Sequence, residues 1–198
     1  MPLKTHVVVI RDVRLKGFRP KGDSVLEVNF DTPIVWPITW AVEKAKEFGE
    51  ENWMFLKIMA HGYRSSKDSN GGCGIQFCEE DIKLTNLHNW QTLCRKEGGR
   101  QFPYFRGIDL MACGAAYITP GKDGEDGDGN YFCYRMAQIT QSYVRASTAT
   151  QEYDPGSNDE PHLDFGDWEG TVYTYNPKGE VVKIEQAPLA DTLPWGID

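Results

Sequence analysis

A cysteine and a histidine of this chain each end a short apolar stretch, and a glycine follows each of them. The stretch WMFLKIMA leads into His61-Gly62, and the stretch GIDLMA leads into Cys113-Gly114. An isolated thiol has a pKa of about 8.5 and is mostly protonated at neutral pH, and a neighbouring imidazole can take its proton. Cys113 as nucleophile and His61 as base therefore form the smallest set of side chains that performs acyl transfer.

The two glycines meet the second need of that chemistry, which is a site for the charged oxygen of the tetrahedral intermediate. Backbone N–H groups usually form such a site, and the substrate must approach them closely. Gly62 and Gly114 have no Cβ that would block this approach. Both glycines are therefore candidates for the backbone around the reacting carbonyl.

Strands that alternate with helices can bring these residues together. Apolar or β-branched stretches predict the strands, and apolar residues that share one helical face predict the helices. The predicted strands are 6–10, 25–30, 53–60, 107–112 and 145–150, with a short one at 74–78, and the predicted helices are 39–48, 87–96 and 131–144. This order predicts an α/β three-layer sandwich with a mostly parallel sheet, followed by a hairpin that turns at 176–179. Ligands bind at the carboxyl ends of such strands, where His61 and Cys113 both lie.

The two motifs resemble those of the caspase-like (clan CD) cysteine peptidases, which include caspases, legumains, gingipains, clostripain-like enzymes and separases. Here His-Gly and Ala-Cys-Gly each follow an apolar stretch, and 52 positions separate His61 from Cys113; the interval in caspases is about 50. The resemblance covers about residues 6–150 and implies a caspase-like fold. It also implies that Cys113 attacks the scissile carbonyl, that His61 transfers the proton, and that the N–H groups of Gly62 and Cys113, with Gly114 beside them, hold the oxyanion.

Two departures from the caspase pattern bear on substrate preference. Met111 stands where caspases carry glutamine, and Gly-Ala-Ala follows Cys113 in place of Arg-Gly. The preference of caspases for aspartate is therefore not implied.

An acidic stretch follows the last predicted strand of the sheet. Between Gln151 and Gly170 there are seven acidic residues and no Lys or Arg: Glu152, Asp154, Asp159, Glu160, Asp164, Asp167 and Glu169. In the resembled family the loop after the fifth strand helps to form the specificity pocket, and an acidic pocket would bind a substrate Arg or Lys. Asp154 and Asp159 are the substrate-binding candidates. The alternative is a solvated surface loop.

The loop GKDGEDGDGN at 121–130 is acidic and rich in glycine. Its acids do not follow the spacing of a calcium-binding EF-hand loop, so we expect a solvated loop and no metal. In the resembled family this region is often cleaved during activation, which makes Lys122 a candidate processing site. The other cysteines, at 73, 78, 94 and 133, contain no CxxC pair, and we expect Cys94 and Cys133 to be packed in the interior.

The composition limits the classes of partner. The net charge of −8 argues against nucleic acid, and the basic residues at 11–21 are expected to lie on a solvated loop. Five cysteines without a regular framework suggest reduced thiols and a cytoplasmic protein, although secretion by a route without a signal peptide stays open. No signal peptide or membrane span is visible, no cofactor is indicated, and the oligomeric state is not indicated either.

The combined prediction is a single caspase-like domain over residues 1–198, with its core at about 5–150, that acts as a cysteine endopeptidase on a peptide or protein after a basic residue. A catalytically silent caspase-like module that binds a protein partner is the alternative. A nucleotide-binding doubly wound domain is disfavoured, because Arg-Asp-Val-Arg, and no glycine-rich loop, follows the first strand.

Overall fold

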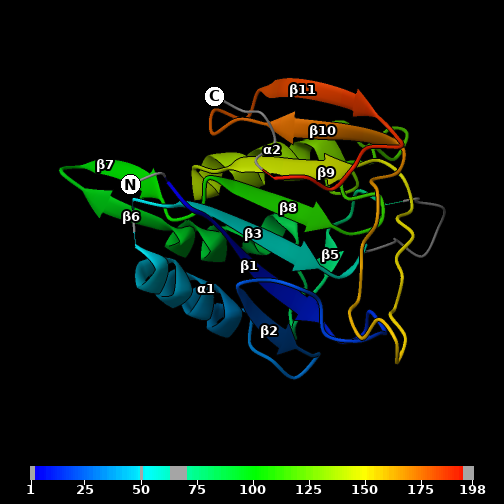
Figure 1. Ribbon diagram of the computed structural model, residues 1–198. Helices are drawn as coiled ribbons and strands as arrows, with labels where there is room; N and C mark the ends of the chain where they lie inside the picture. The colour runs from blue at the N-terminus through cyan, green and yellow to red at the C-terminus, as the bar shows by residue number, and fades with distance from the viewer. Residues whose placement is uncertain (1–2, 50, 63–70, 194–198) are drawn as a thin grey trace.

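The computed structural model describes residues 3–49, 51–62 and 71–193, and its elements are shown in Figure 1. They are β1 (Thr5–Asp12), β2 (Ser24–Val28), α1 (Val35–Phe48), β3 (Trp53–Met59), β4 (His61–Gly62), β5 (Ile75–Gln76), the 3₁₀ helix η1 (Leu84–Leu93), β6 (Cys94–Glu97), β7 (Arg100–Pro103), β8 (Gly107–Met111), α2 (Gly129–Thr140), β9 (Tyr143–Ser147), β10 (Thr171–Tyr175) and β11 (Val181–Gln186).

A seven-stranded sheet forms the centre, in the order β11-β10-β9-β8-β3-β1-β2. Within this sheet, β2, β1, β3, β8 and β9 are mutually parallel. Strands β10 and β11 are antiparallel to their neighbours. The predicted α/β class and the mostly parallel sheet are therefore confirmed.

The described helices cover one face of this sheet. After β2 the chain moves in a single direction across the sheet, to β3, then β8, then β9. Right-handed connections then place α1, η1 and α2 on the same face. Val8 and Ile10 of β1 and Leu56 of β3 point into the core beneath these helices. The step from β1 to β2 runs in the opposite direction, so its connection lies on the other face.

Irregular chain covers that second face. Val9 and Met59 lie there, in a smaller cluster with Leu163, Phe165 and Trp168 from the segment 151–170. In Figure 1, α2 is seen behind β8 and β9, and the yellow to orange segment 151–170 runs along the strand ends at the right. Over the described ranges, the expected third layer is thus loop instead of helix.

Two predicted helices differ in their bounds. Helix α1 begins at Val35, four residues earlier than predicted, because Pro37 is tolerated in a first turn. Helix α2 ends at Thr140, and β9 starts at Tyr143.

The prediction of an α-helix over 87–96 was wrong. Residues 84–93 form a 3₁₀ helix, and β6 and β7 then make a hairpin. Gly98 and Gly99 turn this hairpin with φ values of 55° and 78°, as its two-residue connection requires.

The basic residues at 11–21 are only partly solvated. Arg11 is 4% exposed and pairs with Glu27, and Arg14 pairs with Asp12. The expectation of a solvated basic loop was wrong for these two arginines. None of the helices in the described ranges is both long and apolar enough to cross a bilayer.

Candidate active site

The site residues lie where ligands bind in sheets of this topology. The chain continues from β1 outward to β2 and later returns to the other side of β1 as β3, which makes the β1/β3 boundary a switch point. Asp12 ends β1, His61 follows β3, and Cys113 follows β8, which pairs with β3. All three therefore lie at the carboxyl edge of neighbouring strands.

The backbones around His61 and Cys113 run side by side beyond the strand ends. The Ala60 N–H donates to the Met111 carbonyl over 3.3 Å. A Cβ at Gly62 would lie 1.8 Å from the Cys113 carbonyl oxygen, so only glycine fits there. The sequence prediction that His61-Gly62 and Cys113 meet at one edge is thus consistent with the structure.

The half-buried His61 has one ring nitrogen engaged. Its Nε2 lies 3.1 Å from the Arg14 carbonyl oxygen. A carbonyl only accepts hydrogen bonds, so Nε2 carries the proton and Nδ1 of the neutral ring is the acceptor. Within the described residues no hydrogen bond joins this ring to Cys113 Sγ; catalytic hydrogen bonds often tighten only when substrate binds.

Cys113 is also half-buried and contacts Gln151. The Gln151 N–H donates to Sγ over 3.4 Å, and Sγ lies 3.8 Å from the Gln151 carbonyl oxygen. The Gln151 side chain donates to the Glu169 carbonyl over 3.2 Å and accepts from the Glu169 N–H over 3.1 Å. Gln151 therefore connects Cys113 to both ends of the acidic loop.

One of the three expected oxyanion donors is excluded. The Gly114 N–H donates to the Ala149 carbonyl over 2.7 Å, so it cannot also hold a substrate oxygen. The Cys113 N–H makes no hydrogen bond within residues 3–49, 51–62 and 71–193. Cys113 and Gly62 remain the candidates, and the Gly114 N–H instead fixes the backbone after Cys113.

A cavity of about 850 Å³ opens on the loop-covered face, and Asp154 and Asp159 both line it. Met59 and Met111, each two residues before a member of the dyad, form part of its wall together with Glu152. Neither His61 nor Cys113 lines it. The cavity can therefore accept a side chain next to a reacting bond, not the bond itself.

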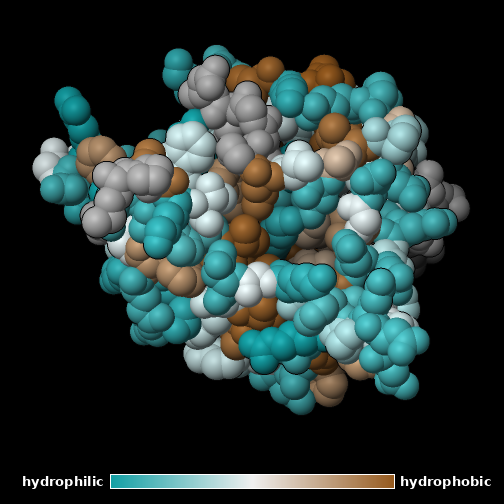
Figure 2. All heavy atoms as spheres, in the orientation of Figure 1, coloured by the Kyte–Doolittle hydropathy of each residue, from teal (hydrophilic) through white to brown (hydrophobic). Residues whose placement is uncertain are grey.

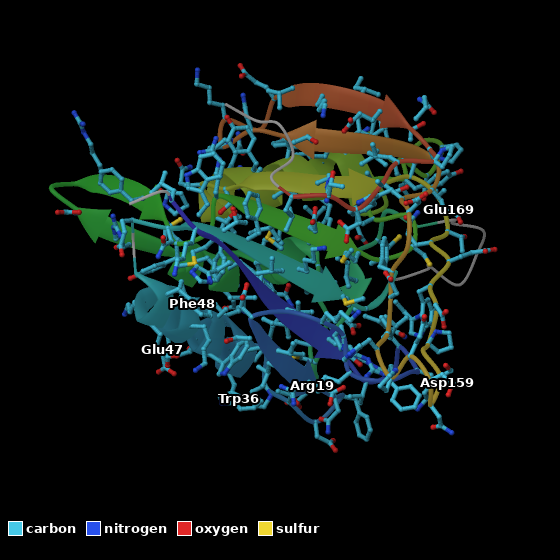
Figure 3. All side chains as sticks on the ribbon, in the orientation of Figure 1. Arg19, Trp36, Glu47, Phe48, Asp159 and Glu169 are labelled. Carbon is cyan, nitrogen blue, oxygen red and sulfur yellow. The ribbon has the colours of Figure 1, made fainter. Side chains whose placement is uncertain are left out.

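The cavity is acidic because its loop carries unpaired charge. No ion pair forms at any of the seven acids of 152–169 within the described chain. Figure 3 shows Asp159 and Glu169 on this loop, at the strand ends. One Asp154 carboxylate oxygen accepts the Gly156 N–H over 2.8 Å, which leaves the other oxygen for a ligand.

The cavity floor is electrically balanced. Asp191 pairs with both Lys57 and Arg145, and Arg145 also binds the buried Asp109. Hydrophilic side chains cover most of this face, with apolar side chains visible near its middle (Figure 2). The excess negative charge of the cavity therefore comes from the loop and not from the floor.

The remaining predicted residues lie apart from the dyad. Lys122 is exposed, 3.7 Å from Glu125, in the loop before α2. Asp128 of the same loop caps α2 by accepting the Tyr131 N–H over 3.0 Å. The described residues contain no cluster of three or more His, Cys, Asp or Glu side chains that could hold a metal.

Three of the other four cysteines are buried, and Cys94 is half-buried. Cys133 is fully buried on the inner face of α2, and burial raises its pKa. Burial also raises the pKa of Cys78, and it raises the pKa of Cys94 to about 11. Cys94 begins β6 instead of facing inward from a helix, and its thiol donates to the Thr140 carbonyl over 2.8 Å. Cys73 is buried beside the segment that approaches Gly114.

Sequence reasoning missed three residues of the site: Asp12, Arg14 and Gln151. Two of them act through backbone groups, which residue type does not reveal. A charged residue at the end of an apolar strand is the signal that could have pointed to Asp12.

No protein-family model, no curated protein and no solved structure matches this chain.

Proposed function

We propose that the protein is a cysteine endopeptidase of the caspase-like kind. The observation that carries this proposal is the contact of Gly62 with the Cys113 backbone at the carboxyl ends of β3 and β8. It brings a histidine and a cysteine to one edge of the sheet, beside an acidic cavity.

The proposed reaction proceeds in two acyl-transfer steps. His61 Nδ1 takes the Cys113 proton, and the thiolate attacks the substrate carbonyl to form a tetrahedral intermediate. The Cys113 N–H stabilises the new oxyanion, and His61 returns the proton to the departing amine. Water, with His61 again as base, then hydrolyses the thioester and releases the free acid and the thiol.

The cavity supports a preference for Arg or Lys before the cut bond. Its lining includes Glu152, next to the residue that touches Cys113 Sγ, and its loop acids have no ion-pair partner within the described chain. A guanidinium or ammonium group gains charge-assisted hydrogen bonds there.

A panel of fluorogenic peptides tests the proposal. Peptides with Arg or Lys before the bond should be cleaved, and those with Asp, Asn or Leu should be cleaved far more slowly, with and without calcium. Cys113→Ala should abolish turnover while the circular dichroism spectrum stays that of the wild type. Undiminished activity in Cys113→Ala would exclude Cys113 as the nucleophile.

Loop variants test the specificity. Asp154→Asn and Asp159→Asn should each lower kcat/KM for an Arg peptide about threefold, the loss expected for an exposed charge pair. Asp126→Asn removes an equal charge from the exposed loop before α2 and should leave kcat/KM unchanged. An equal effect of all three variants would point to overall charge instead of a binding pocket.

A silent interaction module is the second candidate. It is favoured by the separation of the His61 ring from Cys113 Sγ, which share no hydrogen bond within the described residues. In that case iodoacetamide should label Cys113 no faster than a model thiol. Faster labelling at neutral pH supports the peptidase.

A further inference from the structure

Asp12 is a fully buried carboxylate whose two oxygens both accept hydrogen bonds. Oδ1 accepts from the Arg14 N–H over 3.0 Å and from Arg14 Nε over 2.8 Å. Oδ2 accepts from Arg14 Nη2 over 2.7 Å and from the Cys78 N–H over 2.9 Å. A buried carboxylate needs such compensation, and the planar guanidinium supplies it in a fixed two-bond geometry.

Arg14 connects this carboxylate to His61. Its side chain also donates to the Cys78 carbonyl over 3.0 Å, and its own carbonyl accepts from His61 Nε2 over 3.1 Å. The hydrogen bond that the guanidinium donates to Asp12 is the largest cause that raises the pKa of Arg14, so the guanidinium stays charged.

The ring of contacts closes through the neighbouring segment. His61 of β4 pairs with Gln76 of β5, and the chain reaches Cys78 two residues later. Asp12 and Arg14 thus hold both the acceptor of the His61 ring and the strand that pairs with the His61 backbone.

We propose that Asp12 and Arg14 are positioning residues for His61, which fix the Arg14 carbonyl against Nε2 and so hold the tautomer whose Nδ1 is free to act as a base. The base role rests on the proposed function; the tautomer does not. Neither residue touches the reacting atoms.

Arg11, the neighbouring buried arginine, stabilises a different segment. Its guanidinium donates to the carbonyls of Leu15, Gly17 and Phe18 and pairs with Glu27. These bonds hold the outer part of the β1–β2 connection and none of them involves His61. Glu27→Gln is therefore a matched control that weakens an Arg–carboxylate pair between β1 and β2, away from His61.

Ring ¹⁵N NMR of His61 tests the proposal without any substrate. The wild type and Glu27→Gln should show His61 as the Nε2–H tautomer. In Asp12→Asn the new amide NH₂ faces a hydrogen-bond donor in either orientation, since both carboxylate oxygens accept. The ratio of the two tautomers should then change about tenfold, the effect expected for one lost hydrogen bond. Arg14→Lys keeps the charge but loses the two-bond geometry, and should change the ratio in the same direction.

The labelling rate of Cys113 gives a second readout. Asp12→Asn and Arg14→Lys should lower the rate of iodoacetamide labelling at pH 7 relative to Glu27→Gln, because a displaced imidazole no longer assists the thiol. A wild-type His61 in the Nδ1–H form would overturn the proposal. So would folded Asp12→Asn or Arg14→Lys proteins with the tautomer ratio of Glu27→Gln. If Asp12→Asn does not fold, Arg14→Lys tests the proposal, because the Arg14 side chain is partly exposed and a change there is better tolerated. If the wild type cleaves no peptide while the tautomer ratios change as expected, the result counts against the peptidase function and not against the positioning role of Asp12 and Arg14.

Discussion

At the residue scale, the cysteine thiols of this protein differ in how strongly burial raises their pKa. Burial raises the pKa of Cys78 and Cys133, and raises that of Cys94 to about 11. The half-buried Cys113 instead has its sulfur beside the Gln151 N–H. Only a thiolate reacts quickly with an alkylating agent, so the cysteines should differ strongly in rate.

Iodoacetamide at pH 7.5 should therefore modify Cys113 before it modifies Cys78, Cys94 or Cys133. Cys94 should react about a hundredfold more slowly than a model thiol with a pKa of about 8.5. Its rate should rise as the pH approaches 11, because a raised pKa delays formation of the thiolate. Peptide mapping by mass spectrometry measures each site, and earlier labelling of Cys94 or Cys133 than of Cys113 would contradict the expected order.

The sequence was sufficient to predict that His61 and Cys113 lie at neighbouring strand ends, but not what surrounds them. His61 and Cys113 could be predicted because each ends an apolar stretch and precedes glycine, which places it at a strand end. The Arg14 carbonyl and the Gln151 N–H contact them through backbone atoms, which every residue possesses. Gly114 looked like an oxyanion donor because the sequence does not reveal that its N–H is taken by Ala149.

At the element scale, the parallel strands were predictable and the connection before β8 was not. Apolar stretches of five to eight residues are typical of strands that are buried on both faces. Leu87, Trp90 and Leu93, the buried residues of η1, recur every three residues, which fits the three residues per turn of a 3₁₀ helix. The same three residues fall within the apolar face of an α-helix, so spacing alone cannot distinguish the two.

A buried ion pair across β8 and β9 offers a test of the sheet. Asp109 and Arg145 are register partners, and two hydrogen bonds of 2.7 and 2.9 Å join them. Arg145→Met leaves Asp109 buried without this partner and should lower the free energy of unfolding by about 3–5 kcal/mol. Asp109→Leu should cost less, because Arg145 keeps its ion pair with Asp191. The double variant should be more stable than Arg145→Met, because it removes the buried carboxylate that Arg145→Met leaves without its partner.

Urea denaturation of the four proteins measures this coupling as a double-mutant cycle. Lys57 and Asp191 can still pair in every variant, so the cavity floor keeps its own ion pair. Additive losses in the double variant would show that the pair is not the source of the stabilisation.

At the scale of the whole molecule, the two layers that cover the sheet differ in kind. Helices cover one face, and the irregular segment 151–170 covers the other together with residues near Leu189. The irregular layer is fastened by the reciprocal backbone pairs Asp154–Asp164 and Trp168–Leu189. Since this layer supplies the cavity wall and touches Cys113 through Gln151, its local stability bears directly on the candidate site.

Each layer contains one fully buried tryptophan, Trp168 in the irregular layer and Trp90 in the helical layer. Trp168 packs edge-on against Phe165 at 5.2 Å between ring centroids. Replacing a buried tryptophan with alanine costs about 3–5 kcal/mol. If a segment can open by itself, the lost stability should speed hydrogen exchange in that segment only. If the segment opens only together with the core, exchange should become faster throughout the chain.

Hydrogen exchange should therefore distinguish the two substitutions. In Trp168→Ala, the amides of Asp154, Asp164 and Leu189 should exchange at least about a hundredfold faster, whereas those of β3 and β8 should change much less. In Trp90→Ala, the amides of β3 and β8 should lose protection together with the rest of the chain, because Trp90 packs in the core shared by all three helices. Equal deprotection of β3 and β8 in both variants would mean that the irregular layer opens only when the whole sheet unfolds, and that the wall of the acidic cavity is as stable as the core beneath it.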